Sequence, residues 1–520
     1  MEKADVAGRP VHRTLEVLTG AFTWVLITAP IWGAVLAPAK WAWFATAFSL
    51  YWLYKSLSVA AMATLAYGRL RAGQTREWLD EVRRRPGWRA VHHLVVFPTY
   101  NEPVGVLIES LSHLVAQDYP ADRISVLVAF EEREPAARAK AREIETLFAG
   151  RFAHLWTTFH PDQPGEVPGK SSNLAYAVRW ARRALAEDPA IHLDRVLVTV
   201  CDADARLDRR YLSALTCRYL EEPDAEYVFF QPVVLFHANI ARLPLPLRVL
   251  NSMYSVMQLS RMPVGFRLIT QSNYSLSLEL CRRCGYWDVD IIPEDSHMFF
   301  KALFRCGERV RVVPLYVPVW SDAAEGASWW RTTLSHYRQA RRWAWGISDV
   351  PYLVWQMVRC GRPRLWPRYI HPLHYAHEHF LWPSHWFLLV GSLNLLPFLA
   401  PTFAASEIGR ELAALASSLY TACLPSLVVL IWLNWRLRPP GGKRSLGEVL
   451  AFLGSWLCLP LVGFVLVALP ALDAHTRLLF GRYLQYQVTE KRARPRSELA
   501  VPASTLKPST SGLPHPREAA

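Results

Sequence analysis

The chain has 520 residues, of which 52% are hydrophobic, and its formal net charge is +14 at pH 7. A chain of this length exceeds what a single hydrophobic core usually contains, so we expect more than one structural unit. Long apolar blocks in a basic protein indicate contact with anionic membrane lipid. Basic stretches interleaved with aromatic residues, which bind single-stranded nucleic acid, do not stand out, and we expect no nucleic-acid partner.

Five apolar blocks reach the length of about 20 residues that a helix needs to cross the hydrocarbon layer of a membrane. They lie at residues 15–37, 41–66, 380–402, 414–435 and 447–471. The first block has no small-residue cleavage site and is followed at once by the second, which predicts a membrane hairpin rather than a signal peptide. Basic residues follow the second and fourth blocks, so the positive-inside rule places the long middle domain in the cytosol of a multi-pass protein of the inner or plasma membrane.

The fifth block raises a question of topology. Five crossings from a cytosolic N-terminus would leave residues 486–491 outside the cell. Pro460 lies in the middle of this block, where a proline kinks or breaks a helix, and basic residues follow in the tail. Between a full crossing and a bent element that returns the chain to the cytosol, we favour the bent element.

The eight cysteines are scattered, and only Cys281 and Cys284 are spaced like metal ligands or a redox pair. The sequence offers no second pair that would complete a zinc site. We therefore expect ordinary free thiols in a reducing compartment.

Between the second and third blocks, short β-like runs alternate with segments of helical periodicity. The runs are residues 92–98, 124–130, 154–159, 195–200 and 226–230. This alternation predicts an α/β fold, with a mainly parallel sheet and helices on both of its faces. In such sheets ligands bind beyond the carboxyl ends of the strands.

The buried run 196–200 leads directly to Asp202 and Asp204. Carboxylate oxygens suit Mg²⁺ or Mn²⁺, which often bridges one or two acids to substrate phosphates. The alternative is a solvated acidic turn. Because other expected strands also end in polar or acidic side chains, we favour the cation site.

Polar groups follow the first two expected strands. Thr99, Asn101 and Glu102 come after the first strand and Glu131 ends the second. Such groups could grip a base or a ribose, or form an ordinary polar loop. Lys170 stands just before an expected helix start, where an ammonium group and free backbone N–H groups suit phosphate.

Two later segments also combine charge with helical periodicity. Glu294 and Asp295 precede an apolar helix, where they either cap the helix or supply a general base. Gln339, Arg342 and Trp343 lie on a basic, aromatic, amphipathic stretch that can rest on anionic lipid and can also bind substrate.

In this order, the D-x-D at 202–204, the E-D at 294–295 and the Q-x-x-R-W at 339–343 resemble the processive, membrane-integrated members of glycosyltransferase family 2, such as cellulose, hyaluronan and chitin synthases. The resemblance covers residues 90–346 well and the flanking spans in outline. It implies a GT-A-like cytosolic domain and a nucleotide-sugar donor, expected to be a UDP-sugar. The segment 486–491 resembles the F-x-V-T-x-K gating loop of cellulose synthases, with Tyr486 in place of phenylalanine.

The resemblance implies roles for the residues around the donor. Thr99, Asn101 and Glu102 would lie in the nucleotide pocket. Glu131 would stand where the family usually has an aspartate that binds the uracil or the ribose, and Lys170 would lie near the donor.

The acids match the family's reacting groups. Asp202 and Asp204 would hold the Mg²⁺ or Mn²⁺ and the diphosphate. Asp295, next to Glu294, would be the general base that deprotonates the acceptor hydroxyl. A separate base without an obvious enzyme nucleophile implies a single inverting displacement.

The remaining motif implies contacts with both substrates. Arg342 would lie near the diphosphate, Trp343 near the acceptor sugar and Gln339 beside them. Two positions depart from the family pattern, since Gln271 replaces a small residue below the acceptor and His297 stands where an aspartate is frequent. These departures predict an acceptor site of different shape.

We expect six segments along the chain. They are an N-terminal transmembrane hairpin (1–67), a GT-A-like domain (68–327), interfacial helices with the Q-x-x-R-W motif (328–375), a C-terminal transmembrane region (376–472), a gating-like interfacial segment (473–492) and a disordered tail (493–520).

Transfer of a sugar to a growing polysaccharide, coupled or not to export, is the function that the motifs favour. Transfer of a single sugar to a lipid carrier or other membrane acceptor is the alternative, favoured by the small number of spans. A transporter would keep its ionisable groups in the spans, and a non-catalytic scaffold would have lost the acids. The expected partners are a nucleotide sugar, a polysaccharide or lipid-linked acceptor and membrane lipid, with a homodimer or accessory export proteins left open.

Two charged features have no role in this scheme. Lys55 lies inside the second apolar block, where it lines a polymer channel or extends to the membrane surface. A histidine-rich segment near the third block offers either a metal site or a polar interfacial segment. Its side chains are those of His371, His374, His377, Glu378 and His379.

Overall fold

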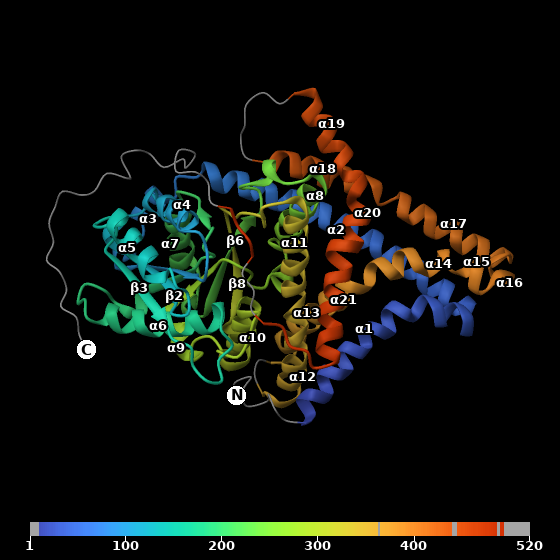
Figure 1. Ribbon diagram of the computed structural model, residues 1–520, viewed down its shortest axis with the longest axis horizontal. Helices are drawn as coiled ribbons and strands as arrows, with labels where there is room; N and C mark the ends of the chain where they lie inside the picture. Colours follow the sequence, from blue (N-terminus) through green and yellow to red (C-terminus); the bar gives the residue numbers. More distant parts are fainter. Residues whose placement is uncertain (1–9, 362–363, 439–444, 486–488, 493–520) are drawn as a thin grey trace.

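The computed structural model describes residues 10–361, 364–438, 445–485 and 489–492, so the tail predicted to be disordered, residues 493–520, lies outside the described residues. In Figure 1 a sheet covered by helices fills the left half of the molecule, and long helices extend to the right. The two halves share one core, because helices of the right half contribute to the same buried cluster as the sheet.

Eight strands form one mixed sheet. They are β1 (His92–Thr99), β2 (Ile124–Glu131), β3 (His154–His160), β4 (Val196–Val200), β5 (Arg206–Leu207), β6 (Val228–Leu235), β7 (Tyr274–Ser277) and β8 (Arg311–Trp320). Their order is β3-β2-β1-β4-β7-β6-β8-β5. The first four in this order are parallel, as are β6 and β8, whereas β7 and β5 run antiparallel to their neighbours. The predicted α/β sheet is confirmed, and β7 and β5 make it mixed.

The strands are continuous runs of Val, Ile, Leu and Phe because both faces of the sheet are covered. Every residue of β1, β2, β4 and β6 is buried. In the register, Val198 of β4 lies opposite Leu94 of β1 on one side and Leu276 of β7 on the other. Successive residues belong to different clusters: Leu94 packs on one face and Val95 on the other.

Helices cover both faces of the sheet, as predicted. One face packs against α3 (Trp78–Arg83), α4 (Val104–Val115), α5 (Ala137–Phe148) and α7 (Tyr211–Glu221). The other packs against α2 (Pro38–Thr75), α6 (Lys170–Ala186), α8 (Leu245–Arg261), α9 (Leu278–Arg283) and α10 (Glu294–Cys306). All eight cysteines are free thiols, and Cys281 and Cys284 are buried in the second cluster.

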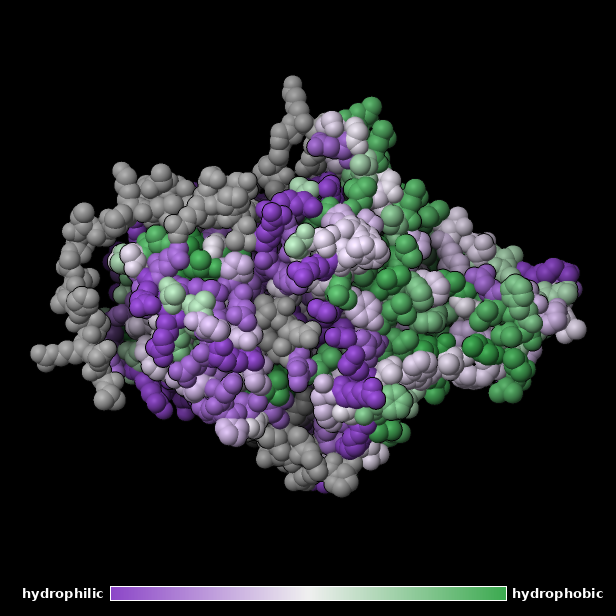
Figure 2. Space-filling model, viewed as in Figure 1, coloured by the Kyte–Doolittle hydropathy of each residue, from purple (hydrophilic) through white to green (hydrophobic). Residues whose placement is uncertain are grey.

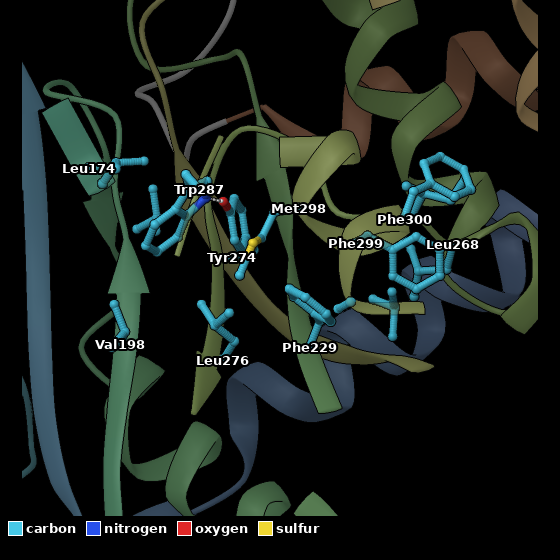
Figure 3. Close-up of a cluster of buried hydrophobic side chains, with 14 of the residues drawn as sticks. Leu174, Val198, Phe229, Leu268, Tyr274, Leu276, Trp287, Met298, Phe299 and Phe300 are labelled. Atoms are coloured by element: carbon cyan, nitrogen blue, oxygen red, sulfur yellow. Dashed lines mark hydrogen bonds between the residues drawn. The ribbon is translucent and has the colours of Figure 1, made fainter. Parts of the chain in front are cut away.

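Figure 3 shows part of this second cluster, with Val198, Leu276 and Phe229 on three neighbouring strands of the sheet and Leu174 on α6. Trp287 Nε1 donates a hydrogen bond to the hydroxyl of Tyr274 at 2.7 Å inside the cluster. Both aromatic side chains are fully buried. The loop before α10 is therefore fixed to the start of β7, which positions the two polar segments described below.

The remaining helices form the right half of Figure 1 and its junction with the sheet. They are α1 (Pro10–Leu36), α11 (Trp329–Ala344), α12 (Val350–Arg359), α13 (Leu365–Trp386), α14 (Ser392–Asn394), α15 (Leu396–Leu399), α16 (Pro401–Ala404), α17 (Glu407–Thr421), α18 (Leu424–Leu437), α19 (Leu446–Ser455), α20 (Leu459–Val462) and α21 (Leu469–Leu479). Two π-helical turns, η10 (Phe387–Gly391) and η12 (Gly463–Ala468), interrupt them. In this half the fold is wholly helical over the described residues.

Among the described residues, three helical stretches are long and apolar enough to cross a membrane: Val11–Leu36, Glu407–Leu437 and Leu446–Leu479. Figure 2 shows hydrophobic side chains gathered over the right half and hydrophilic ones over the sheet half, which indicates membrane association of the helical half. The predicted block 41–66 lies within α2, where Lys55 and many Tyr, Ser and Trp residues reduce the apolar character. The block 380–402 is divided among α13, η10, α14, α15 and the start of α16.

The fifth predicted block is an irregular helical stretch. A 3₁₀ turn at Trp456–Cys458 precedes Pro460, and η12 follows it, so the regular helix is broken where the proline predicted a break. The 34 residues of Leu446–Leu479 would measure about 51 Å as a straight helix, whereas the hydrocarbon layer is about 30 Å thick. This stretch is therefore longer than one upright crossing requires.

Candidate active site

Polar segments from four elements meet at the edge of the sheet where β4 ends. Asp202 follows β4, and its backbone N–H donates to Asn273 Oδ1 at 2.7 Å, which ties the end of β4 to the start of the antiparallel β7. At the same edge α6 begins at Lys170 and α10 begins at Glu294. This is the edge at which α/β sheets bind their ligands.

Lys170 is the centre of this cluster. Its Nζ donates to Asp202 Oδ1 at 2.7 Å and to the carbonyl oxygen of Ser272 at 2.9 Å, and it lies 2.8 Å from Glu294 Oε1. Only 9% of the lysine side chain is exposed. Burial alone would lower the pKa of this ammonium group, but Asp202 and Glu294 outweigh burial and raise the pKa of Lys170 well above its ordinary value. Lys170 therefore stays positively charged.

Ser272 connects the acid after β4 to the acid at the start of α10. Its Oγ donates to Asp202 Oδ2 at 2.5 Å, and its backbone N–H donates to Asp295 Oδ2 at 2.7 Å. Ser272 has φ of 56°, in the left-handed region that residues other than glycine rarely adopt. One residue in an uncommon backbone conformation thus holds both acids.

Asp295 and Glu294 are adjacent in sequence but differ in environment. Asp295 is half-buried and accepts backbone hydrogen bonds from Ser272 and, at 2.7 Å, from Ser296. Glu294 is buried against Lys170, and burial raises the pKa of Glu294 to about 7, although Lys170 opposes the rise. Burial also raises the pKa of Asp295. Of the two residues, Asp295 is the more exposed.

Asp204 belongs to a second cluster. Its Oδ2 accepts the backbone N–H of Asp322 at 2.7 Å, and its Oδ1 accepts a hydrogen bond from Lys491 Nζ at 2.7 Å. Lys491 Nζ also lies 3.2 Å from Glu102 Oε1. Burial would lower the pKa of Lys491, but Asp204 and Glu102 outweigh it and raise the pKa far above the ordinary value. A positive charge is thus held between the acid of the D-x-D and the polar loop after β1.

The two aspartates fit a divalent cation in donor type and in number. Both supply hard carboxylate oxygens, and both face a positively charged ammonium group, so the site is built to hold positive charge. Among the described residues, three ligand atoms within 4.8 Å of one another occur at His374, His377 and Glu378 and not at the D-x-D. A cation bound by Asp202 and Asp204 would therefore take further ligands from phosphate and water, as Mg²⁺ and Mn²⁺ commonly do.

A cavity of about 590 Å³ opens beside Asp204 and Lys491, within the size range of small-ligand sites. Its lining residues come from the loop after β1, the segment after β8 and the last described stretch of the chain. They are Asn101, Glu102, Pro103, Glu325, Gly326, Ala327, Thr489, Glu490, Lys491 and Arg492. The gating-like segment predicted at 486–491 thus contributes Thr489, Glu490 and Lys491, whereas Tyr486 lies outside the described residues.

The predicted nucleotide-binding residues lie at neighbouring strand ends. Asn101 and Glu102 line the cavity, and the backbone N–H of Asn101 donates to Glu134 Oε2 at 2.8 Å. Thr99 is buried at the end of β1, and Glu131 ends β2 with its Oε2 2.6 Å from Arg133 Nε. Burial raises the pKa of Glu131, although Arg133 opposes this. Neither Thr99 nor Glu131 lines the cavity.

The three residues of the Q-x-x-R-W motif lie on α11. Arg342 Nη2 donates to Thr489 Oγ1 at 3.3 Å, so this arginine reaches the cavity wall. The Trp343 ring packs 5.1 Å from the ring of Tyr254 and 5.6 Å from that of Phe236. Gln339 lies one turn earlier and is half-buried. The structure brings Arg342 to the cavity and places Trp343 in an aromatic cluster beside α8.

Sequence reasoning did not identify Ser272 and Thr270 as site residues. Thr270 Oγ1 donates to the carbonyl oxygen of Asp295 at 2.7 Å, so the segment before β7 holds both ends of this residue. The sequence pointed to this region only through two departures from the family pattern, Gln271 and His297. Gln271 N–H donates to Gln231 Oε1 at 2.8 Å, and the His297 ring lies between Asp288 and Asp349, at 2.9 Å and 3.0 Å.

The profile of glycosyl transferase family group 2 matches residues 197–467, which is more than half of the chain and includes Asp202, Asp295 and the Q-x-x-R-W motif. Together with the sheet and its acidic edge, this makes the protein a glycosyltransferase with a GT-A-like fold. The chain belongs to glycosyl transferase family group 2.

Two solved structures are similar at low identity. The mannosyltransferase PcManGT from Pyrobaculum calidifontis, in complex with GDP-Man and Mn²⁺, is 18% identical with a TM-score of 0.39, and the match covers 71% of this chain and 99% of that chain. S. aureus TarS 1–349, in complex with UDP-GlcNAc, is 12% identical with a TM-score of 0.33, and the match covers 76% of this chain and 94% of that chain. Because both TM-scores are low, nothing about the site is inferred from them. No curated protein matches this chain in sequence.

Proposed function

We propose that this glycosyltransferase transfers a sugar from a UDP-sugar to a growing polysaccharide by one inverting displacement. The observation that carries the proposal is the Ser272 link, which holds Asp202 and Asp295 through two hydrogen bonds of one residue. A group for the leaving diphosphate and a group for the attacking hydroxyl are therefore fixed relative to each other. This is the arrangement that a direct displacement needs.

The acceptor hydroxyl oxygen attacks the anomeric carbon, and the bond from that carbon to the phosphate oxygen breaks. The bonding electrons leave with the nucleoside diphosphate, and the hydroxyl proton passes to the accessible carboxylate of Asp295. Glu294 does not take the proton itself; its ion pair with Lys170 holds that lysine at the site. Lys170 and Arg342 stabilise the negative charge of the leaving group.

Asp202 and Asp204 would hold Mg²⁺ or Mn²⁺ together with the diphosphate, and the cation would neutralise charge on the leaving group. Thr99, Asn101 and Glu102 hold the nucleoside, with Glu131 at the next strand end. The aromatic cluster around Trp343 supports the acceptor side, where an aromatic face can stack on a sugar ring, and Gln339 lies beside it.

The sheet half is cytosolic and the helical half spans the inner or plasma membrane in this proposal. Support comes from the separation of hydrophilic and hydrophobic surfaces in Figure 2. The place of Thr489–Arg492 in the cavity wall requires the chain after α21 to return to the donor side. Coupled export, a homodimer and accessory export proteins belong to the same proposal.

A second candidate is transfer of a single sugar to a lipid carrier. One observation favours it: Lys55 and Arg267 lie between exposed apolar side chains of α2 and α13, away from the cavity. Lipid access from the side of the bundle would suit this candidate. The two candidates differ in the length of the product.

The test is UDP release from a panel of UDP-sugars by the purified full-length protein with Mn²⁺, with products sized on a gel. Because Asp295 takes the proton, Asp295→Asn is expected to lower turnover by about 10² to 10⁴-fold. Arg89→Gln removes a charge from an exposed side chain outside the site and serves as the control. Equal turnover by Asp295→Asn and the wild type would refute the proposal, and a single-sugar lipid product would replace the polysaccharide by the second candidate.

A further inference from the structure

A charged cluster lies between α2, α13 and the end of α8, outside the active site. Lys55 Nζ lies 2.6 Å from Glu378 Oε1, and Arg261 Nη2 lies 3.5 Å from Glu378 Oε2. Arg267, in the 3₁₀ turn η7 (Gly265–Arg267), donates to the hydroxyls of Ser58 at 3.1 Å and Tyr54 at 3.2 Å. Two cationic side chains thus contact one carboxylate, and a third, Arg267, is bound to α2 beside them.

His374 and His377 complete the cluster on α13. Together with Glu378 they place three ligand atoms within 4.8 Å, which is the arrangement of a metal site. A divalent cation there would stand next to Lys55, Arg261 and Arg267, and like charges repel strongly at such distances. Glu378 is already engaged by two of these cations. The balance of charge therefore favours an anion over a metal ion.

Exposed apolar side chains border the cluster. Leu57 of α2 is 50% exposed and Leu373 of α13 is 57% exposed, and Tyr54 and Phe266 are exposed as well. Phe266 also packs against the His374 ring at 5.7 Å. A cationic centre with an apolar border matches an amphiphile that carries an anionic head group and a hydrocarbon tail. A free anion would gain nothing from this border.

Two elements connect the cluster to the candidate base. On α13, Tyr375 donates or accepts a hydrogen bond with Ser296 Oγ at 3.1 Å, one residue from Asp295, and Glu378 follows Tyr375 by three residues, about 4.5 Å along the helix. On the other side, the chain runs from Arg267 to Thr270, which bonds the carbonyl oxygen of Asp295. A head group at the cluster would thus lie beside the elements that hold the base.

We propose that this cluster binds the phosphate or diphosphate ester of a membrane lipid to which the acceptor is attached, with Arg267 and Lys55 as the anion-binding residues. The inference rests on the proposed glycosyl transfer and adds the class of its acceptor. The lipid tail lies along the exposed apolar faces of α2 and α13. The head group extends from the cluster towards Asp295.

The test measures lipid binding without donor or metal, so it does not depend on turnover. Full-length protein in neutral detergent is titrated with a long-chain polyprenyl monophosphate, and binding is followed by native mass spectrometry. The wild type and Asp295→Asn are expected to bind equally, whereas Arg267→Gln and Lys55→Met are expected to bind at least tenfold more weakly. Arg364→Gln, which removes the same charge from a side chain 90% exposed at the start of α13, is the matched control and keeps wild-type binding.

Lys55→Met leaves Glu378 with one cation fewer, so the double variant Lys55→Met/Glu378→Gln keeps the charge balance if the single variant unfolds. Equal binding of a neutral polyprenol of the same length, or of inorganic phosphate, would overturn the inference. So would unchanged binding by both Arg267→Gln and the double variant, or Zn²⁺ binding that His374→Ala abolishes. Failure of the wild type to bind the lipid while it still releases UDP refutes this inference alone, whereas lipid binding by the wild type without any sugar turnover refutes the proposed function.

Discussion

The two aspartates of the D-x-D are each bound by a lysine of the same exposure, yet the two lysines come from very different parts of the chain. Lys170 begins α6 inside the sheet half, and Lys491 lies in the last described stretch. Both side chains are 9% exposed. Asp202 itself is 31% exposed, whereas Asp204 is 4% exposed. Asp202 is thus partly exposed, and its lysine belongs to a helix of the sheet half. Asp204 is buried beneath a segment that is distant from it in sequence.

This difference indicates that the two aspartates of the D-x-D have different roles. The Lys170 cluster is part of the core, because α6 packs on the buried face of β1 and β4. The Lys491 cluster closes the cavity and is attached through Glu490, whose carbonyl oxygen accepts the N–H of Glu325 at 2.9 Å. We infer that the first cluster supports both folding and chemistry, and that the second mainly regulates what binds in the cavity.

Lys170→Met should have the largest effect. It leaves Asp202 and Glu294 without their shared cation, and loss of one partner of a buried ion pair costs about 3 to 5 kcal/mol of folding free energy. Turnover should fall by about 10²-fold or more, because a charge that stabilises the leaving group is removed. Thermal unfolding and UDP release measure the two effects.

Lys301→Met is the control for Lys170→Met, since Lys301 is also a buried lysine bound to a carboxylate, that of Asp288, in the sheet half. It should lose stability but keep more activity than Lys170→Met. If both variants lose turnover equally, the role of Lys170 in stabilising the leaving group is disproved.

Lys491→Met should lower turnover less than Lys170→Met does, and it should also reduce the Mn²⁺ concentration that the enzyme requires. Removing the ammonium group leaves Asp204 and Glu102 free to attract another cation. The Mn²⁺ concentration that gives half-maximal turnover should therefore fall several-fold, even as the maximal rate declines about tenfold because a donor-side contact is lost. Stripping the metal with EDTA and restoring it with Mn²⁺ measures this directly, and an unchanged or higher Mn²⁺ requirement would contradict it.

Arg341→Gln is a suitable comparison for Lys491→Met. Arg341 pairs with Asp473 on α21 at 2.9 Å and does not line the cavity. Its Mn²⁺ requirement should match that of the wild type.

Most of the sheet and the positions of the acids could be predicted from the sequence. Apolar runs such as 196–200 indicate buried strands, and a parallel sheet brings their carboxyl ends to one edge, so Asp202 and Asp204 were expected at the same edge as the polar groups that follow the first two strands. The antiparallel β7 was not predicted, because Tyr274–Ser277 is short and more polar than the other strands. With β7 missing, the role of Ser272 at its start could not be foreseen.

The separate partners of Asp202 and Asp204 also lay beyond the sequence. Lys491 is 287 positions from Asp204, and no local pattern relates residues at such a distance. Likewise, Lys55 and Glu378 were each recognised in the sequence as a charge in or near an apolar block. They are 323 positions apart, and only the packing of α2 near α13 brings them into contact. Short-range periodicity predicts elements, whereas pairs of this kind depend on tertiary structure.

The pH dependence of stability should reveal the contribution of Glu294. Burial raises the pKa of Glu294 from 4.5 to about 7, so the folded protein binds this proton more tightly than the unfolded chain. This group therefore stabilises the fold below about pH 4.5, and the stabilisation is lost as the pH rises to about 7. Glu294→Gln should show a smaller drop in unfolding temperature between pH 5 and pH 8, in the same buffer series, than the wild type. An equal drop in both proteins would exclude Glu294 as the source.

Thr489→Ala should have the smallest effect. It removes the hydroxyl that accepts a hydrogen bond from Arg342 at 3.3 Å, the contact that joins α11 to the segment carrying Lys491. A single hydrogen bond contributes about 0.5 to 1.5 kcal/mol, so turnover should fall by about two- to tenfold with little change in stability. Thr333→Ala, which removes a hydroxyl bonded within α11 itself, is the matched control. Because Arg342 and Lys491 would both act through this segment, Thr489→Ala should have less effect in a Lys491→Met background than in the wild type, and full additivity in a double-mutant cycle of UDP release would show that the two residues act separately.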